Sequence, residues 1–204
     1  MARKSFDEHD DLLALSQANF GIAVGKNTHQ EDNDDLLDLF MLVARANLRL
    51  DRFEEADMAL KEELNALDRR HLTMSERCAL VHELDSTIQR QKGELVVAER
   101  EANAALAIRE RIVPRDDVAV ARALAILAEN QLLLAKWDDV LSGARRGVAL
   151  VAPGSLASDT ELARLAAVSG SALLAKKEFA AAQAEFTREV EWLTPHASEP
   201  PVSA

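Results

Sequence analysis

Two side chains that can bind zinc, Cys78 and His82, lie four residues apart, and a third, His71, lies shortly before them. Zinc in proteins takes three or four ligands, usually arranged in local pairs along the chain. No second pair follows in this sequence. A free cysteine is commonly just a buried side chain. We therefore interpret these residues as a packed cysteine and partly exposed histidines, and we predict no metal and no other cofactor.

Acidic residues near the N-terminus are the next candidates for ion binding. The first 38 residues hold nine Asp and Glu against three Lys and Arg, and Glu31, Asp32, Asp34 and Asp35 lie close together. A calcium loop needs alternating oxygen ligands, a glycine at its turn and a later bidentate Glu. The glycine is missing here. Acidic groups stabilise the positive end of a helix dipole, so we interpret the cluster as helix-start residues.

Motifs for enzymatic chemistry are absent. The seven glycines form neither G-x-G-x-x-G nor G-x-x-x-x-G-K, the loops that cradle phosphates. There is no G-x-S-x-G nucleophile elbow. The serines and histidines show no spacing typical of nucleophilic catalysis. We predict that the protein is not an enzyme.

Composition and charge narrow the function further. The 204 residues include 24 Lys and Arg against 35 Asp and Glu, a formal charge of −11. Nucleic acids and anionic lipids present phosphates, which such a chain repels, so we predict neither as a partner. No run of 18 apolar residues is long enough to span a bilayer. The single cysteine cannot form an internal disulfide, and the N-terminus lacks a signal peptide's apolar run. We expect a cytoplasmic protein.

The residue types favour helices throughout. Aromatic residues make up only 4% of the chain, tyrosine is absent, and there are just seven Gly and five Pro. No segment shows the alternation of β-branched and aromatic residues that is typical of strands. Leu, Ala, Glu and Arg, which favour helices, dominate instead. The sequence therefore predicts an all-α fold.

A pattern of large and small apolar residues repeats every 42 residues. The large residue follows a short polar break and recurs as Phe53, Leu95, Trp137 and Phe179. The small residue comes three positions later, as Ala56, Ala98, Val140 and Ala182. Apolar residues spaced three and four apart precede and follow each break, which indicates one helix on either side. Each unit is therefore a helix, a tight turn and a second helix.

Helix signals divide the chain into three parts. Amphipathic stretches predict helices at 5–20, 34–50, 53–70, 74–91, 94–112, 117–135, 137–151, 159–176 and 179–193. Capping boxes are expected at Thr73 and Ser158. We expect an acidic N-terminal helix and loop (1–33), four repeats (34–195, with breaks near 51, 92, 136 and 177) and a mobile tail (196–204).

These repeats resemble the tetratricopeptide repeat (TPR) family, in its 42-residue variant. The shared features are the helix–turn–helix unit, the large residue that opens each second helix, the small residue three positions later, and a small residue in each first helix (Ala44, Ser86, Ala128 and Gly170). The resemblance implies a right-handed α-solenoid of four repeats after one N-terminal helix. It also implies that the first helices line a concave groove that binds a protein or peptide.

Arginines predominate among the residues expected to face this groove. The candidate binding residues are Arg45, Arg49, Arg90, Arg122, Glu129 and Arg164. Arginine suits bidentate capture of carboxylates, so one interpretation is a site for an acidic peptide segment. The alternative is a solvated helix face with ion pairs along each helix.

The last helix is expected to end the array with a polar outer side. Trp192 is the exception on that side, and it either folds back onto the repeat or anchors a partner or a second copy. The function that we favour is a protein-interaction adaptor or scaffold. The alternative is a regulatory protein that senses a peptide or small ligand and then changes its partner.

Overall fold

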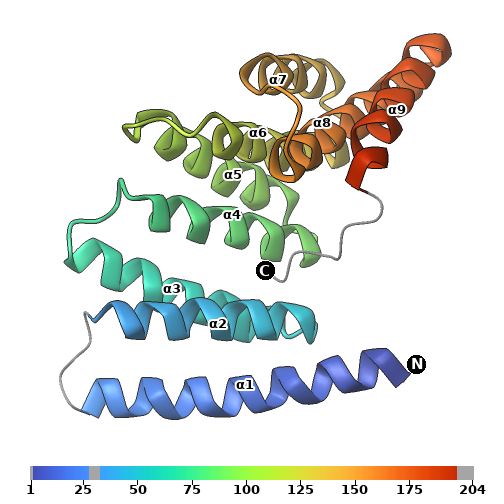
Figure 1. The fold of residues 1–204 in the computed structure, drawn as a ribbon. Helices are drawn as coiled ribbons and strands as arrows, with labels where there is room; N and C mark the ends of the chain where they lie inside the picture. The colour runs from blue at the N-terminus through green and yellow to red at the C-terminus, as the bar shows by residue number, and fades with distance from the viewer. Residues whose placement is uncertain (1, 28–32, 197–204) are drawn as a thin grey trace. The chain divides into compact units, whose positions relative to one another are not determined.

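The structure is a computed structural model that describes residues 2–27 and 33–196. Within those ranges it contains nine α-helices, one 3-10 turn and no strand (Figure 1). The elements are α1 (Ala2–Asn27), α2 (Asp34–Arg49), α3 (Phe53–Arg69), α4 (Glu76–Gln91), α5 (Leu95–Arg111), α6 (Asp117–Leu133), α7 (Trp137–Leu150), α8 (Leu156–Ala175), α9 (Phe179–Leu193) and η1 (Thr194–His196). The predicted all-α fold is confirmed.

The predicted helix limits need three corrections. Helix α1 extends to Asn27, seven residues beyond the predicted end. Ser75 rather than Thr73 caps α4, because its hydroxyl accepts from the Cys78 N–H. Helix α8 begins at Leu156, since Ser155 and not Ser158 is its N-cap. Ser158 completes that capping box from the third helical position, so the expected motif exists one turn earlier than predicted.

The same turn joins the two helices of every repeat. One residue in each of these turns adopts a positive φ: Asp51 (56°), Gly93 (82°), Ala135 (59°) and Lys177 (64°), spaced 42 residues apart. The next N–H then bonds to a carbonyl five residues back, at 2.9 Å in each case. This is the Schellman arrangement, which ends a helix by satisfying a free carbonyl. The structure is therefore a helical repeat, and its breaks lie within one residue of those predicted.

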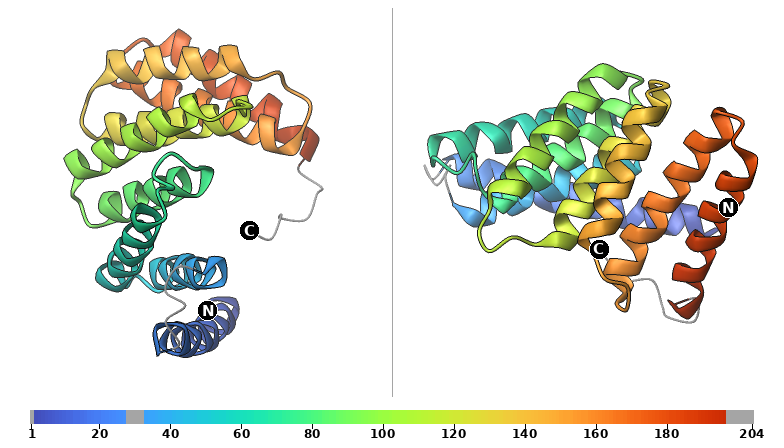
Figure 2. Two further views of the ribbon diagram at one scale, coloured as in Figure 1. Left: turned by 90° about the vertical axis from the view of Figure 1, so that its left-hand side faces the viewer. Right: turned by 90° about the horizontal axis from the view of Figure 1, so that it is seen from above.

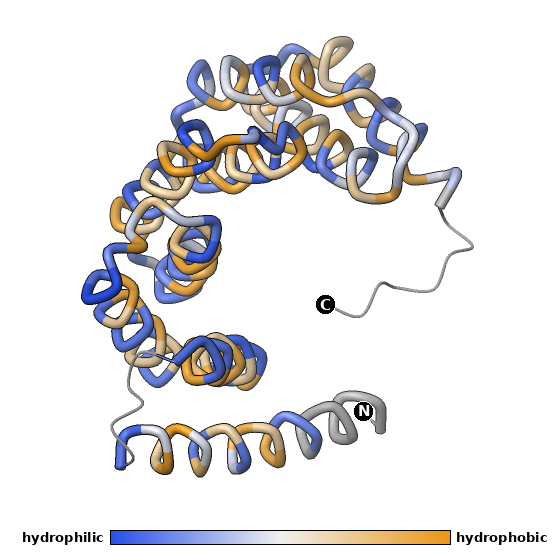
Figure 3. The backbone as a smooth tube through the Cα atoms, turned by 60° about the vertical axis from the view of Figure 1, so that its left-hand side comes forward, coloured by the Kyte–Doolittle hydropathy of each residue, from blue (hydrophilic) through white to orange (hydrophobic). Residues whose placement is uncertain are grey.

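The described helices form two compact units, 1–108 and 109–204. In the first unit, α2 packs against both α1 and α3, and α3 packs against α4. In the second, α6 and α8 pack against each other and α7 packs against both. Apolar and polar residues alternate around the turns of the helices (Figure 3), and the apolar sides of α2 to α8 supply most of the buried core. None of the helices at 2–27 and 33–196 is long and apolar enough to cross a bilayer.

Two glycines let α1 approach α2 closely. A Cβ atom on Gly21 would lie 2.7 Å from a methyl of Leu39, and one on Gly25 would lie 3.3 Å from a methyl of Leu36. Both distances are shorter than ordinary van der Waals contact. The two glycines are one helical turn apart, so they form a flat strip on the side of α1 that meets α2. Helix α1 is therefore part of the first compact unit.

The second unit ends in a helical pair, α8 and α9, that lie side by side (Figure 2). Gly170 of α8 makes room for the ring of Phe186, whose nearest atom would be 2.7 Å from an added Cβ. Ala182 is the one fully buried residue of α9. The predicted tail, 196–204, lies outside the described residues except for the backbone of His196.

Candidate functional site

Three of the predicted groove arginines form ion pairs within the chain. Arg49 of α2 pairs with Asp11 of α1 through both Nε and a terminal nitrogen. Arg122 of α6 donates to Glu161 of α8 at 2.9 Å. Arg164 of α8 bridges Glu129 of α6 at 2.6 Å and Glu161 at 3.1 Å. Most of these bonds join two different helices. The alternative interpretation, a solvated helix face, instead predicts ion pairs between residues of the same helix.

The remaining two arginines, Arg45 and Arg90, differ in exposure. Arg90 is half-buried in the last turn of α4 and is not a free side chain. Arg45 is exposed on α2 and forms no hydrogen bond or ion pair with the described residues. It lies in a shallow hollow of about 440 Å³ between α2 and α4, together with Asp38, Met41, Glu76, Arg77 and Leu80. Arg45 is therefore the one predicted groove arginine whose guanidinium is available to a ligand.

A buried carboxylate lies next to this hollow. Glu63 of α3 is 0% exposed, and its Oε1 accepts from Arg77 Nε at 2.7 Å, while Arg77 also donates to Asp38 at 2.6 Å. The second carboxylate oxygen of Glu63 has no hydrogen-bond partner among the described residues. Burial raises the pKa of Glu63 to about 7, against the opposing effect of Arg77. This group therefore exchanges its proton near neutral pH.

The candidate zinc residues have another arrangement. Cys78 is buried, and His82 Nδ1 lies 2.8 Å from the Glu101 carboxylate of α5. Hydrogen bonding to Cys78 and to Glu101 raises the pKa of His82 to about 9. Across 2–27 and 33–196, no three Cys, His, Asp or Glu residues are placed to hold a metal. Cys78 is thus packed and His82 partly exposed, as expected, and His82 is in addition a cation that ties α4 to α5.

This pairing predicts an unusually basic histidine. In an NMR titration, the His82 ring should keep its imidazolium shifts to about pH 9, because losing the proton also loses the ion pair with Glu101. Replacing Glu101 with Gln should lower that midpoint by at least one pH unit, since it removes the facing charge. An unchanged midpoint in Glu101→Gln would contradict the ion pair.

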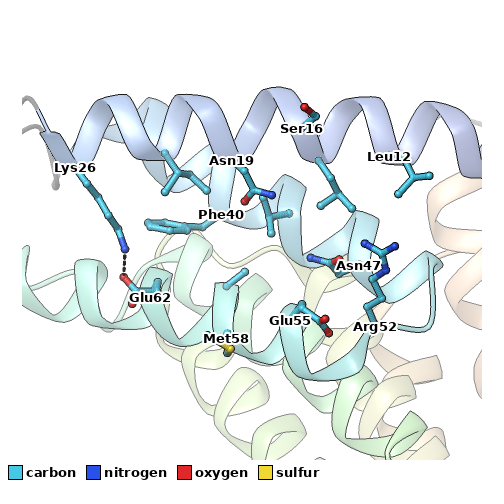
Figure 4. A pocket seen from close by; sticks show the side chains of 14 residues that line it. Leu12, Ser16, Asn19, Lys26, Phe40, Asn47, Arg52, Glu55, Met58 and Glu62 are labelled. Carbon is cyan, nitrogen blue, oxygen red and sulfur yellow. Dashed lines mark hydrogen bonds and ion pairs between the residues drawn. The ribbon is translucent and has the colours of Figure 1, made fainter.

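A second hollow in the first unit is an open cleft between α1 and α3, with α2 as its floor (Figure 4). Its volume is about 490 Å³. Apolar side chains line it, among them Leu15, Ile22, Phe40, Val43 and Ala59. Leu12 on α1 and Met58 on α3 form exposed apolar lips. The cleft can therefore receive apolar side chains from solvent.

Polar residues occupy the two ends of this cleft. At one end Lys26 pairs with Glu62 at 2.9 Å, and its Nζ lies 5.7 Å from the centre of the Phe40 ring. At the other end are Asn47, Arg52 and Glu55 (Figure 4). The Lys26–Glu62 bridge spans the cleft from α1 to α3, so it closes that end. The opposite end stays open.

None of the features predicted from the sequence locates this cleft, although two signals of it are present. Gly21 and Gly25 mark the side of α1 that meets another helix. Phe40, Val43 and Asn47 recur at spacings of three and four, which predicts that they form the packing stripe of α2, and α1 covers that stripe only in part. Because α1 precedes the repeats, the 42-residue pattern contains no information about where it packs.

The outer face of α9 is more apolar than expected. Phe179 and Val190 lie at spacings that predict an apolar packing stripe along α9, but they are 63% and 62% exposed because no described helix follows to cover them. Together with Leu174 and Phe186 they line an open hollow. Trp192 is half-buried, so its exposure does not decide between folding back onto the repeat and anchoring a partner or a second copy. This face is a possible interface.

Comparison with known proteins bears on the fold alone. No protein-family model matches the chain, and no curated protein matches it. Among solved structures, the crystal structure of BtubC (BKLC) from P. vanneervenii is similar, with a TM-score of 0.71 and 19% sequence identity. The match covers 84% of this chain and 68% of that chain. The protein thus shares an all-helical fold with BtubC.

Proposed function

We propose that the protein is a non-enzymatic interaction module, a cytoplasmic adaptor or scaffold of TPR type. In this proposal its four repeats follow α1 in a right-handed solenoid. The recurring Schellman turn and the 42-residue spacing support a TPR-like unit. The binding surface would be the face of the first helices, where the predicted arginines lie. The partner would be a protein or an acidic peptide segment.

Arg45 is the observation that carries this proposal. Its guanidinium is exposed and forms no hydrogen bond or ion pair with the described residues, although its charge helps to lower the pKa of Glu63. It lies in a hollow with the apolar side chains of Met41 and Leu80. A free guanidinium can hold a carboxylate through two parallel hydrogen bonds. The neighbouring Arg77 is already satisfied by Asp38 and Glu63. A partner carboxylate would therefore bind Arg45 without breaking an existing ion pair.

Affinity capture from native cytosol tests this function. The Arg45→Glu variant should lose at least 90% of a specifically captured protein, because it replaces attraction by repulsion. Arg145→Glu is the matched control, an exposed arginine on α7 of the second unit, and it should retain that protein. Both variants should melt within about 2 °C of the wild type, since exposed residues contribute little to stability. Equal capture by wild type and Arg45→Glu would contradict the proposed site.

The paired arginines are unsuitable for such a test. Reversing the charge of Arg122 would place a carboxylate beside the buried Glu161, and reversing Arg49 would do the same beside Asp11. Like charges in partly buried surroundings are destabilising. A loss of binding in those variants would therefore be inseparable from a loss of folding. If wild type and both exposed-site variants capture nothing, the proposal of a ligand-sensing regulator takes precedence.

A further inference from the structure

The cleft between α1 and α3 lies on the opposite side of α2 from Arg45. Phe40, Val43 and Asn47 line the cleft at spacings of three and four, whereas Met41 and Arg45 line the hollow beside α4. Helix geometry places these two sets on opposite faces of α2. Whatever the cleft binds is therefore separate from the ligand of the proposed function.

Asn47 is a buried polar side chain in the lining of this cleft. It is 4% exposed, and its amide forms no hydrogen bond with the described residues. The amide atoms are not among the fully buried polar atoms that lack a partner, so a ligand in the cleft can reach them. Asn19 of α1 lines the same cleft (Figure 4). Each amide offers both a donor and an acceptor, which match the N–H and C=O of a peptide backbone.

The dimensions of the cleft favour an extended segment over a helix. Its α3 side runs from Arg52 to Glu62, which is about 15 Å at the helical rise per residue. An extended chain of four or five residues covers about the same length. A bound helix has a diameter of about 10 Å and an internally bonded backbone, so it would leave Asn47 unsatisfied. An extended backbone has free N–H and C=O groups to offer.

The charge of the surroundings favours a basic ligand. Residues 1–108 hold 22 Asp and Glu against 13 Lys and Arg, a net charge of −9. At the end of the cleft away from Lys26, Glu55 is exposed and forms no ion pair with the described residues. Arg52 is the basic side chain at that end, and Lys26 at the other end is already paired with Glu62. A negative field of this kind attracts cationic partners.

We propose that this cleft binds a short extended segment of a protein partner in which basic residues alternate with large apolar ones. Successive side chains of an extended chain point to opposite sides. The apolar residues then enter the cleft between Leu12 and Met58, and a basic residue faces outward to Glu55. Asn47 and Asn19 hold the backbone between them.

Methionine methyl NMR tests this proposal with a defined probe. The chain has four methionines, of which Met58 lines the cleft, Met41 lines the Arg45 hollow and Met74 lies between α3 and α4. The probe is the capped peptide Lys-Leu-Lys-Leu-Lys. We expect it to shift the Met58 methyl and to leave Met41 and Met74 in place. A shift of Met41 or Met74 without Met58, or no shift at all, would overturn the proposal.

Two control peptides separate charge from apolar contact. Glu-Leu-Glu-Leu-Glu keeps the leucines and reverses the charge, and Lys-Gln-Lys-Gln-Lys keeps the charge and removes the leucines. Both should bind the cleft at least tenfold more weakly than the probe. Equal binding of either one would overturn the assigned ligand chemistry. None of these outcomes depends on Arg45, so they leave the proposed function independently testable.

Protein variants provide the remaining controls. Met58→Arg should weaken probe binding at least tenfold, because Met58 is 66% exposed on the lip and the new charge repels the lysines. Met74→Arg, the same change at another exposed methionine of this unit, should stay within twofold. Asn47→Leu should weaken binding about fivefold without lowering the melting temperature. If Asn47 served only to stabilise the fold, the same substitution would lower the melting temperature. Equal effects of Met58→Arg and Met74→Arg would show general charge attraction and overturn the site.

Discussion

Val140→Glu is expected to unfold the second unit, lowering its free energy of unfolding by at least about 3 kcal/mol. Val140 occupies the small apolar position of the third repeat and is 0% exposed. Helix α7 packs there against both α6 and α8. A carboxylate at this position must leave water with no partner in place to compensate it. A loss of this size is a large share of the stability of an ordinary domain.

Tryptophan fluorescence measures this effect selectively. Both tryptophans, Trp137 and Trp192, lie within 109–204, so their emission reports the second unit alone. The expected loss corresponds to a fall in melting temperature of more than about 12 °C for a domain of this size. Val148→Glu is the matched control, the same change on the same helix at a position that is 36% exposed. Equal melting of the two variants would show that the repeat register is wrong.

The repeats could be predicted because local chemistry and spacing agree in them. A Schellman turn depends on residues within one turn of a helix end, and the same chain distance separates Asp51, Gly93, Ala135 and Lys177. Only one of the four is glycine, so no single residue type marks the turn. The signal lies in the large and small apolar residues that follow it, since these must pack in every repeat. Ala56, Ala98, Val140 and Ala182 are accordingly all buried.

The side-chain pairs of the site could not be predicted in the same way. Arg77–Asp38, Arg122–Glu161 and Arg164–Glu129 link residues 39, 39 and 35 positions apart. These separations are slightly shorter than one repeat, as expected for residues on adjacent first helices. Opposite charges at this spacing were a usable signal. The helical register predicts that the arginines share a face. Which acidic residue pairs with each arginine depends on how far one helix is shifted along its neighbour.

Glu63 illustrates a second limit of the sequence. It follows Glu62 in the chain, and both are glutamates of one helix. Glu62 is exposed and pairs with Lys26, whereas Glu63 is fully buried and pairs with Arg77. Consecutive residues of a helix point about 100° apart, so one position decides between solvent and core. The chemical consequence, a carboxyl with a pKa of about 7, arises from that burial.

The buried carboxyl of Glu63 should make the first unit less stable as pH rises. Its pKa in the folded chain, about 7, lies above the ordinary value of 4.5, so the folded state binds the proton more tightly than the unfolded state. The resulting stabilisation is complete below pH 4.5 and is lost as pH rises through 7. Between pH 6 and 8 the loss is about 1.4 kcal/mol. His82 acts in the same direction at higher pH, because its raised pKa stabilises the folded state until pH rises through about 9.

Glu63→Gln isolates the contribution of Glu63 from every other titrating group. The amide cannot ionise, so this variant should lose about 1.4 kcal/mol less than the wild type between pH 6 and 8, as measured by urea unfolding with far-UV circular dichroism. His82 titrates equally in both proteins and cancels in the difference. Glu55→Gln, at an exposed and unpaired position of the same helix, should follow the wild-type profile. Parallel profiles for Glu63→Gln and the wild type would mean that Glu63 stays ionised inside the folded chain. In that case Arg77 would have to stabilise the ionised carboxylate strongly. It donates one hydrogen bond, from Nε to Glu63 Oε1 at 2.7 Å, and leaves Oε2 without a partner.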